Sequence, residues 1–358
     1  MGNSLQPLLV PPCLSGDATS VKTIINETRE KKTLDKVKDL AGPDGSTPLV
    51  CAAFKGSAEC VKLLLDEGAD PLIGNKQQID AFWVACGYDQ REVLEVLISW
   101  AKESSKDLAL IMRSANNSGD SPLLAAGFKG NVGILGVLTK HLSAEQIAEL
   151  AEVENNKGDA LLSVAVGAEQ SEFLEQLVAI LLKAGRGEEI WLKRDKRGLC
   201  PIHIAAERGN EKVFRQCLTT SFSVLQLCDD PRQDETRGST HCRGTHALHT
   251  ACLCGHAAIV ELILERLDSD KTISDREKID FLNQQNTAGQ TPYWIASRGR
   301  GYPTRDKCRE LLEGVAAVDT TIVDDENVSP KEAGERAEEK RAANEERRKA
   351  EMATTKAE

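Results

Sequence analysis

The sequence predicts an all-α protein built from stacked helix–turn–helix units, and three observations support this. One short pattern, Gly-x-Thr-Pro followed by apolar and small residues, recurs along the 358-residue chain. Each copy is followed by a stretch in which Val, Leu and Ile recur with the period of a helix. Aromatic residues make up only 4% of the chain, so any core must consist mostly of Leu, Ile, Val and Ala. Together these features favour an array of small repeated units over one large globular core.

Seven copies of the pattern set the length of the repeat. Five copies are clear and two are weaker, and they occupy residues 45–56, 79–89, 119–130, 158–170, 198–210, 244–256 and 289–299. The residues at the Thr position of these copies are Thr47, Asp80, Ser121, Ala160, Cys200, His246 and Thr291. The steps between them are 33, 41, 39, 40, 46 and 45 residues. Because the step never falls below 33, we interpret the unit as a 33-residue repeat with surface insertions.

The pattern has the chemistry of a short first helix. Ser, Thr or Asp before a helix accepts a hydrogen bond from a free backbone N–H, and Pro at the first helical position needs no N–H. Paired small residues such as Ala52 and Ala53 let neighbouring helices approach closely. A Gly then permits the left-handed conformation that ends the helix, as expected at Gly56, Gly130, Gly209 and Gly255.

A longer second helix is expected after each first helix. Val, Leu and Ile recur there at the spacing of one helix face. These segments are 58–68, 91–100, 131–142, 171–182, 211–218, 257–267 and 305–312.

These units resemble those of the ankyrin repeat family. The family's Thr-Pro-Leu-His-x-Ala signature is matched most nearly at residues 200–205, where the sequence is CPIHIA, and Gly-Ala-Asp at 68–70 is similar to the family's repeat ending. The resemblance covers about residues 45–314. It implies an ankyrin-repeat solenoid with β-hairpin-like loops between the repeats, and a role in protein recognition.

The flanking sequences predict a three-part organisation. Residues 1–44 are expected to form a degenerate capping repeat, residues 45–328 the array of about seven repeats, and residues 329–358 a polar cap with a charged tail. Pro11 and Pro12 are expected to break the helix that the family has near the N-terminus. Ser329-Pro330 is expected to open a last capping helix. The tail from residue 331 carries eight basic and eight acidic residues, which fits either a solvated helix or a disordered segment.

Composition and charge argue against several classes of function. A net charge of −11 argues against a general binder of nucleic acid or anionic membranes. The apolar stretches are far shorter than the ~20 residues that span a bilayer. The first residues lack the features of a secretory signal, so the eleven cysteines are interpreted as reduced thiols. We therefore expect a cytoplasmic or nuclear protein.

Enzyme motifs are missing from the sequence. No phosphate-binding loop, dinucleotide fingerprint, zinc-protease motif or nucleophile elbow occurs. The repeats also leave no segment of ~100 residues for a catalytic domain. We predict that the protein is not an enzyme and has no catalytic residues and no cofactor.

One cluster of potential metal ligands needs a separate interpretation. Zinc favours four His or Cys ligands, and sixteen residues contain His241, Cys242, His246, His249, Cys252, Cys254 and His256. The ankyrin resemblance favours structural roles instead: His249 occupies the signature His position, which is implied to hydrogen bond within and between repeats, and His256 follows the Gly that ends the helix. Cys252 replaces a buried Ala. We predict no metal site.

The family resemblance implies that a partner protein binds the concave surface made by the loop tips and first helices. Phe54, Tyr88 and Phe128 stand out there, because exposed aromatics beside polar residues are candidate anchors; alternatively, each ring folds back over its own helix end. The residues placed on this surface are Phe54, Lys55, Tyr88, Asn117, Phe128, Lys129, Lys157, Arg194, Lys196, Arg197, Glu207, Arg208 and Arg298.

Two stretches of the C-terminal half are basic. Residues 191–215 hold seven basic and three acidic residues, and residues 296–309 hold five basic and one acidic residue. These charges indicate either that the C-terminal half binds an acidic segment of a partner or that the basic residues form a solvated face.

The leading hypothesis is therefore a non-catalytic scaffold or adaptor that binds protein partners, without nucleic acid or a membrane span, and acts as a monomer. The alternative is a regulatory or targeting subunit of an enzyme complex, such as a substrate receptor or a chaperone-like assembly factor.

A zinc-dependent module and a membrane-surface anchor through a lipid on Gly2 are two further hypotheses. Gln6 stands where the lipidation motif has Ser or Thr, which disfavours the anchor.

Overall fold

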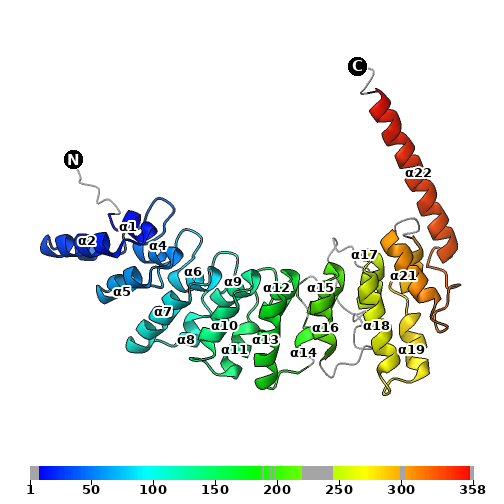
Figure 1. Cartoon of the computed structure of the whole chain (residues 1–358), viewed down its shortest axis with the longest axis horizontal. Coiled ribbons are helices and arrows are strands. Elements are labelled where there is room, and N and C mark those ends of the chain that lie inside the picture. The colour runs from blue at the N-terminus through cyan, green and yellow to red at the C-terminus, as the bar shows by residue number, and fades with distance from the viewer. Residues whose placement is uncertain are drawn as a thin grey trace. The chain divides into compact units, whose positions relative to one another are not determined.

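The computed structural model describes residues 8–187, 189–193, 195–196, 199–219, 245–298 and 303–354. The chain divides into two compact units, Met1–Gly187 and Glu188–Glu358. In the described residues all regular secondary structure is helical (Figure 1). The division into parts at residues 44 and 328 stays a prediction.

Unit 1 is a stack of helical pairs in two layers (Figure 1). The first helices pack on one another in chain order, and so do the second helices. The first helices are α1 (Val10–Ser15), α4 (Pro48–Lys55), α6 (Ala81–Gly87), α9 (Pro122–Lys129) and α12 (Leu161–Gly167). The second helices are α2 (Ala18–Glu30), α5 (Ala58–Asp66), α7 (Arg91–Glu103), α10 (Val132–Leu138) and α13 (Ser171–Lys183).

Unit 2 repeats this arrangement. Its first helices are α15 (Pro201–Arg208), α17 (Ala247–Cys254) and α20 (Pro292–Arg298), and its second helices are α16 (Glu211–Thr219), α18 (Ala257–Ser269) and α21 (Pro303–Glu313). A final helix, α22 (Pro330–Thr354), packs against α20. The all-α ankyrin-type fold expected from the sequence is thus confirmed.

Short extra helices account for most of the additional length of the repeats. The 33-residue step from Thr47 to Asp80 has none, whereas four of the five longer steps contain α8 (Leu108–Ile111), α11 (Ala144–Ala151), α14 (Glu189–Leu192) and α19 (Asp275–Leu282); much of the fifth, from Cys200 to His246, lies outside the described residues. Another short helix, α3 (Leu34–Val37), follows α2. These insertions were expected to lie on the surface, but Ile147 and Phe281 in them are buried. A short helix with one apolar face extends the core, because it packs beside the second helices, as α11 does on α13.

The expected caps are present at both ends of the first helices. The Thr47 hydroxyl accepts a hydrogen bond from the Val50 N–H at 3.2 Å, and the Asp80 carboxylate accepts one from the Trp83 N–H at 2.8 Å. Gly56 ends α4 in the left-handed conformation, with φ of 80°. Where a repeat lacks this Gly, Asp89 and Glu169 adopt φ of 54° and 60° instead. A side chain with a Cβ is strained in this conformation.

Replacing Glu169 by Gly is therefore expected to raise the free energy of unfolding of unit 1 by about 1 kcal/mol. The side chain is exposed, so the change removes backbone strain without emptying the core. Chemical denaturation followed by circular dichroism measures the effect. Glu169→Gln keeps the strain and removes the charge, so it serves as the control. An equal gain in that variant would contradict the explanation.

The prolines near the N-terminus do not break the first helix, contrary to expectation. Helix α1 begins at Val10, so Pro11 and Pro12 lie in its first turn. The N–H groups of a first turn have no partner within the helix, and proline is tolerated there. Helix α1 packs against α4 as an additional first helix.

The loops between repeats are hairpin-like, as the resemblance implied. An Asn or Asp five residues before the capping position organises six of the described loops, as in Asn116, whose side-chain oxygen accepts from the N–H groups of Ser118 and Asp120, both at 2.9 Å. Neighbouring tips bond to each other, since the Asn117 N–H donates to the Gln77 carbonyl at 3.0 Å. The residues at this position are Asn75, Asn116, Asn155, Asp195, Asn286 and Asp324. No role was predicted for these residues, although their recurrence five residues before the cap is visible in the sequence.

A ring N–H on the first helix ties several repeats to the next loop. The donor lies three residues after the capping residue, which is the signature His position, and the acceptor is the carbonyl just before the next capping residue. Tryptophan makes the same bond as histidine, because both rings carry an N–H at a similar reach. The bonds join Trp83 to Asp120, His249 to Gln290 and Trp294 to Val328, at 3.1, 3.1 and 2.9 Å.

The charged tail is helical, which decides between the two alternatives left by the sequence. Ser329 caps α22: its hydroxyl accepts from the Glu332 N–H at 3.3 Å, and its own N–H donates to the Glu332 carboxylate at 3.0 Å. Ala333 is buried near the start of the helix. The described side chains from Glu338 onward are exposed.

Candidate protein-binding surface

A row of exposed apolar side chains crosses unit 1 at the C-terminal ends of its first helices. Phe54, Tyr88 and Phe128 are 49%, 49% and 59% exposed. They lie at the C-terminal ends of α4, α6 and α9, which pack on one another in this order (Figure 1). Leu14 on α1 is also 49% exposed, and it precedes Gly16 by two residues as Phe54 precedes Gly56. The structure therefore extends the row by one repeat beyond the residues expected from the sequence.

Two of these rings contact each other across repeats. The centroids of Phe54 and Tyr88 lie 4.8 Å apart in an edge-on arrangement. The backbone beneath the row is held by the next repeats, because Gln90 donates to the Phe54 carbonyl at 3.3 Å and Gln170 donates to the Phe128 carbonyl at 3.5 Å. The backbone that carries these exposed side chains is therefore held in place at the helix ends.

Basic side chains flank the row. Lys55 and Lys129 are exposed, and the Lys129 ammonium lies 5.5 Å from the centre of the Phe128 ring. At that distance the cation is attracted by the face of the ring. A partner covering the row would thus meet positive charge at its border.

Asn117 and Lys157, the two loop-tip residues expected on the surface of unit 1, differ in their hydrogen bonds. Both Asn117 and Lys157 are exposed. The Asn117 side chain donates to the Lys76 carbonyl at 3.0 Å, and the backbone carbonyl of Asn117 accepts from the Asn156 side-chain amide at 2.9 Å. Asn117 therefore ties neighbouring tips together, whereas the long Lys157 side chain extends from its tip.

In unit 2 the expected residues that the structure describes are all exposed. They are Lys196, Glu207, Arg208 and Arg298, while Arg194 and Arg197 lie outside the described residues. The Arg298 guanidinium lies 6.0 Å from the centre of the Trp294 ring. The Glu207 carbonyl accepts a hydrogen bond from His256 at 2.9 Å.

Part of the basic charge in unit 2 is neutralised locally. Arg215 pairs with Glu211 at 2.9 Å, and Lys307 with Glu261 at 3.6 Å. Arg309 pairs with Glu313 at 2.7 Å. The charge available to a partner is therefore smaller than the count along the sequence indicated.

The histidine cluster forms hydrogen bonds within the core. His246 replaces Thr as the helix cap: its Nδ1 accepts from the Leu248 N–H at 3.2 Å, and its Nε2–H donates to the Phe281 carbonyl at 3.2 Å. His249 Nδ1 accepts from the His246 N–H at 3.3 Å, and its Nε2–H makes the bond to Gln290 described above. Both nitrogens of each ring are therefore occupied. His241 and Cys242 lie outside the described residues.

Desolvation governs the titration of these rings. Both His246 and His249 are buried, and burial lowers the pKa of His249 to about 4 and that of His246 well below its usual range. The centroids of the two buried rings lie 4.1 Å apart in an edge-on arrangement, so the rings would repel each other if both were protonated. Both are therefore neutral near pH 7.

Two further findings concern the described part of the chain. No helix there is long and apolar enough to cross a membrane. Eight of its cysteines are free thiols, and seven of these eight are buried.

Comparison with known proteins identifies the family. A family model described as ankyrin repeats (3 copies) matches residues 13–109 and 165–275. Human rabankyrin-5 is 29% identical over 185 residues, which are 51% of this chain and 14% of that protein. Human NF-kappa-B inhibitor alpha is 33% identical over 111 residues, 31% of each chain. The putative ankyrin repeat protein YahD of Escherichia coli is 26% identical over 202 residues, 55% of this chain and 88% of that protein.

The chain thus spans less than a third of the length of rabankyrin-5 and of NF-kappa-B inhibitor alpha. With the family model matching more than half of its residues, the chain belongs to the ankyrin repeat family.

Proposed function

We propose that the protein is a non-catalytic scaffold or adaptor of the cytoplasm or nucleus, which binds a partner protein through the apolar row of unit 1. The observation that carries this proposal is the alignment of Leu14, Phe54, Tyr88 and Phe128 on consecutive first helices. The small residues before them, such as Ala52 and Ala53, are fully buried, whereas these four side chains are about half exposed and free to contact a partner.

The physical case rests on how interfaces gain affinity. Large aromatic side chains on fixed backbone bury much apolar area at little cost in conformational entropy, and a few of them supply most of the binding energy. The rim of lysines beside the row favours a partner segment with apolar side chains flanked by acidic ones.

The test compares the wild-type chain with the variant Phe54→Ala/Tyr88→Ala/Phe128→Ala. Affinity purification from native extract identifies the partner, and calorimetry with the purified partner gives its Kd. We expect the variant to bind about 100-fold more weakly, a loss of about 2.7 kcal/mol. Leu110→Ala/Leu182→Ala is the matched control, because these exposed leucines lie away from the row. Equal binding by wild type and the triple variant would refute the proposal.

A second contact, with an acidic segment of the partner, is proposed for unit 2. Lys196 and Arg208 are exposed and basic. We expect Lys196→Glu/Arg208→Glu to slow association about tenfold at low salt, and less as salt screens the charges. Stopped-flow measurements with the purified partner test this. Lys212→Glu/Lys271→Glu changes the net charge equally at exposed positions elsewhere, and equal slowing by both variants would remove the claim.

A regulatory role is the alternative form of the same function. One relative is by its name an inhibitor of another protein, so binding by this chain can hold a partner inactive. An activity assay of the purified partner, with and without this chain, separates a regulator from a passive scaffold.

A further inference from the structure

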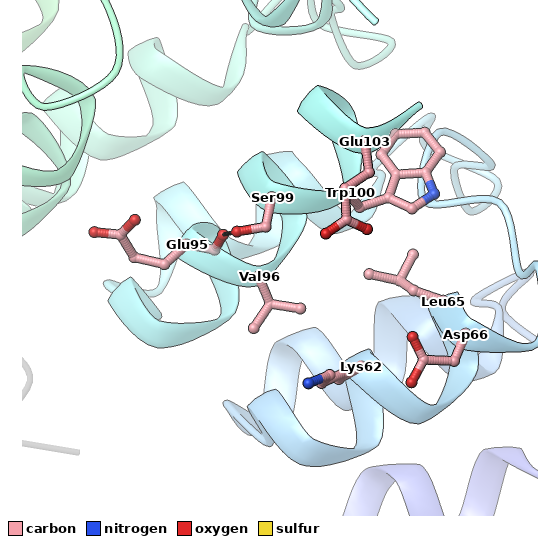
Figure 2. Close-up of a pocket in the computed structure, with 8 residues that line it drawn as sticks. All are labelled: Lys62, Leu65, Asp66, Glu95, Val96, Ser99, Trp100 and Glu103. Atoms are coloured by element: carbon pink, nitrogen blue, oxygen red, sulfur yellow. Dashed lines mark hydrogen bonds between the residues drawn. The ribbon is translucent and has the colours of Figure 1, made fainter. Parts of the chain in front are cut away.

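A groove lies on the second-helix layer of unit 1, away from the apolar row. It runs between α5 and α7 and encloses about 380 Å³. Leu65 and Val96 form its apolar floor, while Asp66 and Glu103 stand on opposite helices and Trp100 closes one end (Figure 2). A volume of this size fits one or two side chains rather than a whole helix.

Two carboxylates, those of Asp66 and Glu103, line the groove together with Trp100. Asp66 is the last residue of α5 and Glu103 is the last residue of α7. The C-terminus of a helix already carries partial negative charge, so a carboxylate there is disfavoured unless a cation is near. Among the described residues, no basic side chain lies within ion-pair distance of Asp66 or Glu103. Neither carboxylate is therefore held in a direct ion pair.

The other charges around the groove do not cancel this field. Glu95 is already neutralised, because its carboxylate accepts from His141 at 2.7 Å and from Lys140 at 3.0 Å. Lys62 lies one helical turn before Asp66, and its ammonium points away from Trp100 (Figure 2). The groove thus has a basic end at Lys62 and an acidic end at Trp100.

Trp100 supplies a second feature that attracts a cation. Its ring is only half-buried, although the equivalent part of a second helix is normally polar where it faces solvent. The face of an indole attracts cations, and a guanidinium group stacks on it well. A guanidinium can also bond two carboxylates at once.

We propose that this groove binds an arginine side chain of a partner protein, with the guanidinium stacked on Trp100 between Asp66 and Glu103. The aliphatic part of the arginine lies over Leu65 and Val96. Charge complementarity selects this occupant: an acidic segment is repelled at Trp100, and a purely apolar one leaves both carboxylates uncompensated. The surface is separate from the apolar row, so this inference does not depend on the proposed function.

The test follows the indole N–H signals of the full-length chain by NMR, with Trp100 assigned from Trp100→Phe. The probe is N-acetyl-Gly-Arg-Gly-amide, added to about 10 mM, since a contact by one side chain is expected to have a Kd near 1 mM. We expect the Trp100 signal to shift and saturate. The citrulline analogue, which has the same shape without the charge, is expected to leave the signal unchanged.

Two variants assign the effect to the groove. Asp66→Asn/Glu103→Gln is expected to weaken binding of the probe at least about tenfold. Glu59→Gln/Glu92→Gln removes the same charge from exposed positions on the same helices, and is expected to bind as the wild type does. An unmoved Trp100 signal, an equal shift with citrulline, or equal weakening in both variants would overturn the proposal. So would self-association of the chain that Trp100→Ala abolishes, because the occupant would then be a second copy.

Discussion

Trp294→Ala is expected to lower the free energy of unfolding of unit 2 by about 3–5 kcal/mol. The side chain is 4% exposed, so its removal leaves a large cavity. Its N–H donates to the Val328 carbonyl at 2.9 Å, and the loss of that bond leaves a buried acceptor without a partner, which adds to the cost. The bond also holds the start of α22, so that helix is expected to loosen together with the core.

Chemical denaturation followed by circular dichroism measures this loss. Trp294→Phe keeps most of the volume and removes only the N–H, so it is expected to cost about 1–2 kcal/mol. Trp100→Ala is the matched control, because that side chain lines a surface groove and is less buried than Trp294. If Trp294→Ala lowered the free energy of unfolding no more than Trp100→Ala does, the bond from Trp294 to Val328 would contribute nothing to stability.

Acidification from pH 7 to pH 4 is expected to destabilise unit 2 by about 3 kcal/mol through His249 alone. Burial lowers the pKa of His249 from 6.5 to about 4 in the folded chain. Below pH 6.5 the unfolded chain therefore binds a proton that the folded chain does not. The destabilisation is absent above about pH 6.5 and grows as the pH falls toward 4. His246 adds to it in the same direction, because its pKa is also lowered by burial.

The measurement is the free energy of unfolding at several pH values between 8 and 4. It is expected to be flat above pH 7 and to fall steadily below pH 6.5. His249→Gln is expected to be less stable overall but to have a shallower slope between pH 6 and pH 5, since one titrating ring is gone. An unchanged slope in this variant would show that other groups cause the acid sensitivity.

Comparison of the sequence with the structure shows which features are local. The caps at Thr47 and Ser121 and the helix-ending glycines were predicted, because each depends on residues within one turn of helix. The break expected at Pro11 and Pro12 was wrong, since the penalty of proline depends on its position in the helix and not only on its presence. The short helices in the insertions were missed because each is too brief for a clear periodic pattern.

The candidate surface was predicted only in part. Exposure of Phe54, Tyr88 and Phe128 followed from their place after the buried small residues, but the contact between two of the rings did not. The bond by which the Asn117 side chain joins two loop tips was not predicted either, and the role of this residue in binding stays a prediction. The groove at Trp100 was not foreseen at all, because its two carboxylates are 37 residues apart in the chain.

The sequence by itself determined the type of repeat, the number of clear repeats and the residues that begin and end the first helices. These features arise from hydrogen bonds and backbone preferences within a few consecutive residues. Only the tertiary structure decided which side chains meet across neighbouring repeats, including the bond from Trp294 to Val328, the neutral pair His246 and His249, and the acidic end of the groove. Such contacts depend on how one helix packs against the next, and the local sequence pattern does not determine the distances between side chains of different repeats.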